Sequence, residues 1–157
     1  MYKVLFVCSG NTCRSPLAEG LLNKAVKEDM DLKDKVVVSS CGTATHYEDT
    51  VQPNAVAAGA KLGIDISGYK SRQFTPDAAA MFDVIIGMTK AHRDIIAERF
   101  PQLKEKTFAL YEFTMGEKDC KNVQDPFGCD LQTYESVAQE LNEQIRLMVI
   151  KLKELTK

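Results

Sequence analysis

Cys8 and Arg14 are the residues of this chain whose types and spacing predict a reaction. They lie six positions apart in the segment Cys-Ser-Gly-Asn-Thr-Cys-Arg-Ser-Pro, residues 8–16. An arginine can hold two oxygens of a phosphate with its planar guanidinium group. A cysteine in the field of such a cation loses its proton more easily and becomes a nucleophile. The pair therefore predicts transfer of a phosphoryl group to the sulfur of Cys8.

The segments on either side of this pair predict how it is positioned. The apolar run at residues 4–7 is typical of a strand, and apolar residues at helical spacing follow from Leu17. A strand, a tight loop and a helix N-terminus in this order form an anion site, because unpaired N–H groups and the helix dipole converge there. Gly10 and Asn11 tolerate the left-handed backbone angles that such a loop needs.

The rest of the chain alternates predicted strands with predicted helices. This alternation predicts an α/β fold, in which a four-stranded parallel sheet has helices on both faces. We expect a single domain over residues 1–157, with Cys8 at the carboxyl end of a strand, where such sheets bind ligands. Strands are predicted at 4–7, 36–40, 83–88 and 107–110. Helices are predicted from Ser15, at 53–62, at 75–81 with Thr75 as N-cap, at 89–100 with Thr89 as N-cap, and from Leu131. A long connection is predicted at 111–129.

The composition is ordinary for a globular protein. The 157 residues are 45% hydrophobic and 27% charged, and the net charge of −2 argues against binding nucleic acid through bulk charge. No apolar run is long enough to cross a membrane, and Met1-Tyr2-Lys3 leads directly into the first strand without a signal peptide. Five cysteines, an odd number, fit thiols in a reducing compartment. We therefore expect a cytoplasmic protein with no nucleic-acid or membrane partner.

Cys8 to Ser15 fits the Cys-x5-Arg-Ser/Thr signature of cysteine-based phosphatases. Its place at the N-terminus and the chain length resemble the low-molecular-weight protein tyrosine phosphatase family. The resemblance extends over essentially the whole chain and includes Ser40-Cys41-Gly42-Thr43, Phe82-Asp83-Val84-Ile85 and Asp125-Pro126. It implies that Cys8 is the nucleophile and that Arg14 binds the phosphate, with no metal or other cofactor.

The resemblance also assigns roles to the loop around Cys8. It implies that Ser15 donates a hydrogen bond to the thiolate, that Asn11 holds the strained backbone of the loop, and that Ser40 supports them. Ser15, followed by Pro16, is equally suited to capping the helix. The expected phosphate-binding residues are Ser9, Gly10, Asn11, Thr12, Cys13, Arg14 and Ser15.

Asp125 is the candidate general acid. By composition alone, Asp125-Pro126 in a loop indicates only a turn, and the resemblance adds the acid role. Cys8 would attack phosphorus while Asp125 protonates the leaving group. Water activated by Asp125 would then hydrolyse the phosphocysteine.

The other cysteines and the histidines have less defined roles. The resemblance implies that Cys13 can form a reversible disulfide with Cys8, and simple space filling is the alternative. Cys41, Cys120 and Cys129 lack the spacing of zinc ligands. We expect both histidines, His46 and His92, at the surface.

Thr12 and Phe127 bear on the substrate. Thr-Cys-Arg-Ser-Pro at residues 12–16 and Asp-Pro-Phe-Gly at residues 125–128 resemble the protein arginine phosphatase branch of the family. A short polar Thr12 admits a guanidinium, whereas members that prefer phosphotyrosine usually carry an apolar residue there. Phe127 could still stack on a tyrosyl ring. Phosphoarginine is favoured slightly over phosphotyrosine.

Two other functions fit parts of the pattern. Arsenate reduction on the same fold would use Cys8, but the related reductases carry a cysteine pair where this chain has Met88-Thr89-Lys90-Ala91. A non-catalytic phosphoprotein-binding module would not need Cys8, Arg14 and Asp125 together. The expected partners are phosphorylated proteins and inorganic phosphate or other oxyanions, and the expected state is a monomer or weak dimer.

Overall fold

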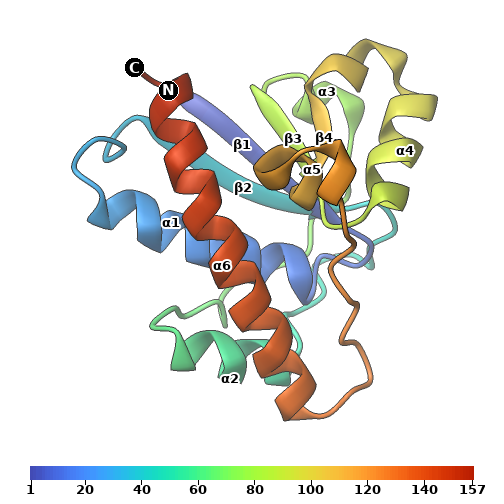
Figure 1. Ribbon diagram of the computed structural model, residues 1–157. Helices are drawn as coiled ribbons and strands as arrows, with labels where there is room; N and C mark the ends of the chain where they lie inside the picture. Colours follow the sequence, from blue (N-terminus) through green and yellow to red (C-terminus); the bar gives the residue numbers. More distant parts are fainter.

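A four-stranded parallel sheet in the order β2-β1-β3-β4 forms the centre of the structure, a computed structural model that describes residues 1–157 (Figure 1). The first strand pairs with β2 on one side and β3 on the other, so the chain changes direction across the sheet at β1. The strands are β1 (Tyr2–Cys8), β2 (Val36–Gly42), β3 (Val84–Gly87) and β4 (Thr107–Ala109). The predicted α/β fold is confirmed. Cys8 is the last residue of β1, the strand that has β2 on one side and β3 on the other.

Helices cover both faces of the sheet. One face packs against α1 (Arg14–Glu28), α5 (Leu110–Met115) and α6 (Leu131–Leu155). Helix α2 (Pro53–Lys61) packs on α1 and α6. The other face of the sheet packs against α3 (Pro76–Ala79), α4 (Lys90–Arg99) and the 3-10 helix η1 (Pro101–Lys106), as Figure 1 shows. None of these helices is both long enough and apolar enough to span a bilayer.

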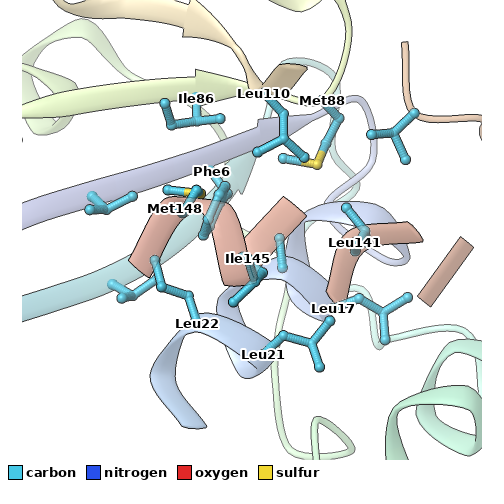
Figure 2. Packing of buried hydrophobic residues seen from close by; sticks show 14 of the residues in the cluster. Phe6, Leu17, Leu21, Leu22, Ile86, Met88, Leu110, Leu141, Ile145 and Met148 are labelled. Carbon is cyan, nitrogen blue, oxygen red and sulfur yellow. The ribbon is translucent and has the colours of Figure 1, made fainter. Parts of the chain in front are cut away.

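The alternation of side chains along β1 divides the core into two parts. Val4 and Phe6 belong to the larger cluster of 31 buried residues, and Leu5 and Val7 to the smaller cluster of 8. Figure 2 shows Met148 of α6 beside Phe6 in the larger cluster. Since β1 is buried on both faces, its last residue, Cys8, has a rigid support.

The predicted caps are correct at two helices and wrong at a third. Thr75 Oγ1 accepts from the Ala78 N–H at 3.3 Å, and Thr89 Oγ1 accepts from the His92 N–H at 3.2 Å. Helix α1, however, begins at Arg14, and its N-cap residue Cys13 makes no capping bond with its side chain. The expectation that Ser15 caps this helix is therefore wrong, because its hydroxyl is buried and bonded elsewhere.

The connection predicted at 111–129 is partly helical. Leu110 begins α5 instead of ending β4, and a second short 3-10 helix, η2, spans Glu117–Asp119. Leu110, Tyr111 and Phe113 are buried against the sheet and α6. Six residues are too few for a periodic pattern to appear in the sequence, so tertiary burial decides this helix.

Candidate active site

A cavity of about 310 Å³ lies beyond the carboxyl end of β1. Three segments line it: the loop after β1, the chain between β2 and α2, and the loop before α6. Cys8, Arg14 and Asp125 all line this cavity. A larger hollow of about 1000 Å³, bounded in part by Glu19 and Arg72, contains none of these three residues. The predicted catalytic groups therefore meet in the smaller cavity.

Cys8 lies at the floor of this cavity. Cys8 is buried, and it is one of the residues that line the cavity. Cys8 Sγ lies 2.9 Å from Ser15 Oγ, a distance at which the hydroxyl can donate to a thiolate. The Ser15 hydroxyl also lies 3.4 Å from the carbonyl of Cys41. Ser15 thus occupies the position that a thiolate-stabilising serine requires.

The loop between β1 and α1 leaves its amides free. None of the backbone N–H groups of residues 9–13 donates a hydrogen bond to another backbone group. Its carbonyls, in contrast, are used: Cys8 and Ser9 accept from Thr43 and Ala44 at 2.9 and 3.0 Å. Backbone donors left without acceptors beside a helix N-terminus are the features of an anion-binding nest.

Only one residue of this loop has a left-handed backbone. Asn11 has φ +56°, whereas Gly10 does not adopt positive φ. The expectation of left-handed angles is therefore correct for Asn11 and wrong for Gly10. A Cβ on Gly10 would lie 3.6 Å from Thr12 Oγ1, an ordinary contact.

Arg14 is held by the loop that carries the candidate acid. Its guanidinium Nη1 donates to the carbonyl of Val123 at 3.1 Å, and its Nη2 lies 3.6 Å from Asp125 Oδ2. The Arg14 side chain is almost fully buried while that of Asp125 is 54% exposed. A fixed, buried guanidinium in the cavity wall can supply a preorganised positive charge to an anionic ligand.

Asp125 is fixed by the turn in which it stands. Its Oδ1 accepts from the Phe127 N–H at 3.1 Å, and Oδ2 faces Arg14. Val123 anchors the segment, because its N–H donates to the Met88 carbonyl at 3.1 Å. A carboxyl group that is partly exposed and close to the cavity can exchange protons with both a leaving group and water.

Asn11 connects the loop to β2. Its amide nitrogen donates to Ser15 Oγ at 2.8 Å and to Ser40 Oγ at 2.9 Å. Its carbonyl oxygen accepts from the Arg72 N–H at 2.9 Å. These three bonds hold a non-glycine residue in the left-handed region, which is otherwise unfavourable. The positions predicted to support the loop, Asn11, Ser15 and Ser40, form one buried cluster.

Glu19 extends this cluster, and the sequence reading missed it. Ser40 Oγ donates to Glu19 Oε1 at 2.6 Å, and the Arg72 guanidinium lies 3.7 Å from the same oxygen. Burial raises the pKa of the Glu19 carboxyl, and the bond from Ser40 and the charge of Arg72 oppose this effect. Glu19 lies four residues after Ser15, about one turn along α1. Nothing in the sequence distinguishes it from a glutamate that faces solvent.

His92 is also a correction, because we expected it at the surface. It is 5% exposed, and its Nε2 lies 3.0 Å from Ser9 Oγ while its Nδ1 lies 2.9 Å from Thr89 Oγ1. Burial, and then the nearby Arg14 charge, lower the pKa of His92 to about 4, with Asp125 acting in the opposite sense. A Cβ on Gly87 would approach His92 Cβ to 2.9 Å, so this glycine makes room for the imidazole. The other histidine, His46, is exposed as expected and lines the cavity mouth.

The residues predicted to affect specificity and redox behaviour also line the cavity. Thr12 is 8% exposed within the wall, and Phe127 is 64% exposed at the opening. Cys13 Sγ lies 3.5 Å from the Tyr134 hydroxyl, and burial raises the pKa of its thiol. Of the expected phosphate-binding residues, Gly10, Thr12, Cys13 and Arg14 line the cavity, whereas Ser9, Asn11 and Ser15 are not among its lining residues.

Comparison with known proteins places this geometry in a family. The family described as "Low molecular weight phosphotyrosine protein phosphatase" matches residues 3–157. The chain belongs to this family. A protein-arginine-phosphatase of Geobacillus stearothermophilus is 34% identical over 151 residues, covering 96% of each chain. The low molecular weight protein-tyrosine-phosphatase PtpB of Staphylococcus aureus is 30% identical over 154 residues, covering 98% of each.

A solved structure supports the same low-molecular-weight phosphatase assignment. The YwlE arginine phosphatase from Geobacillus stearothermophilus superposes with a TM-score of 0.89 at 32% identity, covering 98% of this chain and 94% of that one. The resemblance inferred from residues 8–16 and Asp125-Pro126 is thus confirmed, together with the enzyme class, a protein phosphatase. A non-catalytic binding module is set aside, because the named members are hydrolases.

Proposed function

We propose that this enzyme removes phosphoryl groups from arginine side chains of proteins through a phosphocysteine intermediate. The observation that supports it most directly is that Cys8 and Arg14 line one cavity, at the two ends of a loop whose N–H groups have no backbone acceptors. A phosphoryl group seated in this loop has its oxygens bound and its phosphorus next to the sulfur.

The first step transfers the phosphoryl group to sulfur. The Cys8 thiolate, stabilised by the Ser15 hydroxyl at 2.9 Å, attacks phosphorus, and the bond from phosphorus to the leaving nitrogen breaks. Asp125 gives its proton to that nitrogen. The loop amides and Arg14 hold the three transferring oxygens throughout.

The second step regenerates the enzyme. Asp125, now ionised, takes a proton from a water molecule, and the water oxygen attacks phosphorus. The bond between phosphorus and sulfur breaks, which releases inorganic phosphate and the Cys8 thiolate. The 54% exposure of the Asp125 side chain gives water access to this carboxylate.

Thr12 favours phosphoarginine as the substrate. Its buried hydroxyl in the cavity wall is an acceptor for a guanidinium N–H, whereas a tyrosyl ring offers no donor to it. The relatives named protein-arginine-phosphatase support the same substrate. Phosphotyrosine is the second candidate, because the exposed Phe127 at the opening provides a surface on which an aromatic ring can stack.

The deciding experiment measures kcat/KM of the wild type for two peptides that differ only in carrying phosphoarginine or phosphotyrosine. We expect the phosphoarginine peptide to be the better substrate. A higher kcat/KM for the phosphotyrosine peptide would make phosphotyrosine the proposed substrate instead.

Cys8→Ser is the control for the mechanism. It should retain the fold and bind inorganic phosphate, yet turn over neither peptide. Turnover by this variant at the wild-type rate would exclude Cys8 as the nucleophile.

A further inference from the structure

Asp49 brings a second carboxylate into the catalytic cavity. It lies in the segment between β2 and α2, is half-buried, and lines the cavity together with Asp125. No step of the proposed mechanism uses it. It makes no ion pair, and its only side-chain hydrogen bond comes from the Thr50 N–H to Oδ1 at 2.9 Å. One carboxylate oxygen is therefore available to a ligand.

The backbone fixes the place of this carboxylate. The Asp49 N–H donates to Ser71 Oγ at 2.8 Å, and its carbonyl accepts from the Ser71 N–H at 2.8 Å. Ser71 is buried and also donates to the His46 carbonyl at 2.6 Å. The residue before Asp49, Glu48, has φ +47°, a conformation that turns the chain between the two side chains. As a result, Glu48 borders the larger hollow while Asp49 lines the catalytic cavity.

The same segment is tied to the wall that contains Thr12. The Gln52 N–H donates to the Thr12 carbonyl at 2.9 Å, so the segment bearing Asp49 is bonded directly to the phosphate loop. If Cys8, Arg14 and the loop amides hold the phosphoryl group, as proposed above, a carboxylate from this second segment is available to the part of the substrate beyond it.

We propose that Asp49 is a specificity-determining residue that accepts hydrogen bonds from the guanidinium nitrogens of phosphoarginine that do not carry phosphate. This inference rests on the proposed function. A guanidinium is planar and cationic and presents N–H groups in a fork that matches a carboxylate. A tyrosyl ring has no such donors and would leave the Asp49 carboxylate partly desolvated and unpaired. Asp49 therefore favours one substrate and disfavours the other.

The test compares Asp49→Asn with a matched control, Glu48→Gln, which removes the same charge one residue away and outside the cavity. The measured quantity is the ratio of kcat/KM for phosphoarginine and phosphotyrosine peptides. Asp49→Asn should lower this ratio by about 10-fold, the scale of one charge-assisted hydrogen bond, mainly through KM for phosphoarginine. Glu48→Gln should leave the ratio unchanged. Asp49→Lys should lower it further, because the ammonium repels the guanidinium.

Three results would overturn the inference. An unchanged ratio in Asp49→Asn, with the wild type active on phosphoarginine, rejects the role of Asp49 and leaves the proposed function intact. An equal loss for both peptides, accompanied by weaker inhibition by inorganic phosphate, means that Asp49 only supports the loop. A wild type that does not hydrolyse phosphoarginine rejects the proposed function and this inference together.

Discussion

The carbonyl oxygen of Val123 accepts a hydrogen bond from the guanidinium of Arg14 at 3.1 Å, across 109 positions of the sequence. The Val123 N–H is bonded in turn to the Met88 carbonyl at the end of β3. One residue therefore joins the candidate phosphate-binding arginine, the sheet and the segment that bears Asp125. This connection ties the position of Asp125 to that of Arg14.

Asp125→Asn should lower kcat by about 10²–10⁴-fold for substrates with poor leaving groups, since it removes the proton donor. Activated aryl phosphates, whose leaving groups need no proton, should be affected less. Steady-state rates with a series of aryl phosphates of graded leaving-group pKa measure this difference. Equal slowing across the series would argue against an acid role for Asp125.

Thr12→Ile should shift preference from phosphoarginine toward phosphotyrosine. The substitution replaces a hydroxyl in the cavity wall by an aliphatic group, which loses an acceptor for N–H donors and adds apolar contact for a ring. We expect the ratio of kcat/KM for the two peptides to fall by about 10-fold or more. Thr12→Ser, which keeps the hydroxyl, should stay close to the wild type. A ratio that does not move in Thr12→Ile contradicts our interpretation of this position.

Asn11→Ala should lower the free energy of unfolding by about 2–4 kcal/mol, because it removes buried hydrogen bonds and leaves alanine at a left-handed φ. Urea denaturation measures this change. Asn11→Gly removes the same side chain but tolerates φ +56°, so it should be less destabilised. Both variants should also bind inorganic phosphate more weakly, since the loop loses its tie to Ser40. Phosphate affinity equal to that of the wild type would show that the loop holds its shape without Asn11.

His92→Gln should flatten the dependence of stability on pH between about 6.5 and 4. The wild-type imidazole stays neutral down to a pKa of about 4, whereas the unfolded chain takes up its proton near 6.5. Its contribution is therefore present above pH 6.5 and is lost as pH falls toward 4. The shift corresponds to about 3 kcal/mol. Urea denaturation at several pH values measures it, and identical slopes for the wild type and the variant would refute it.

The sequence predicted the fold and the main site residues because their signals are local. One contiguous segment contains the strand before Cys8, the turn-forming Asn11 and the helix after Arg14. The same residues therefore predicted both the reactive groups and the elements that position them. The caps Thr75 and Thr89 were predictable for the same reason, since each N-cap bond reaches only three residues along the chain.

The residues that were missed depend on contacts between distant segments. His92 is buried through Ser9 and Gly87, and Glu19 through Ser40 and Arg72, and no pattern within helices α1 or α4 indicates either contact. Ser15 was also expected to cap the helix, because the sequence does not reveal that Asn11 Nδ2 donates to its hydroxyl oxygen and holds it at Cys8. Helix α5 was missed because it is stabilised by burial against α6 and has no periodicity of its own.

The floor of the catalytic cavity comes from a strand and a helix, whereas both of its side walls come from irregular chain that is bonded to the rest of the fold at a few points. One wall is held by the bonds from Gln52 to Thr12 and between Asp49 and Ser71, and the other by the bonds of Val123 to Arg14 and Met88. The nucleophile and the two irregular walls are therefore contributed by separate stretches of the chain. Grafting residues 44–52 from another member of the family should change the preferred leaving group while Cys8, Arg14 and Asp125 stay in place. Evolution could diversify the targets of this scaffold by the same route.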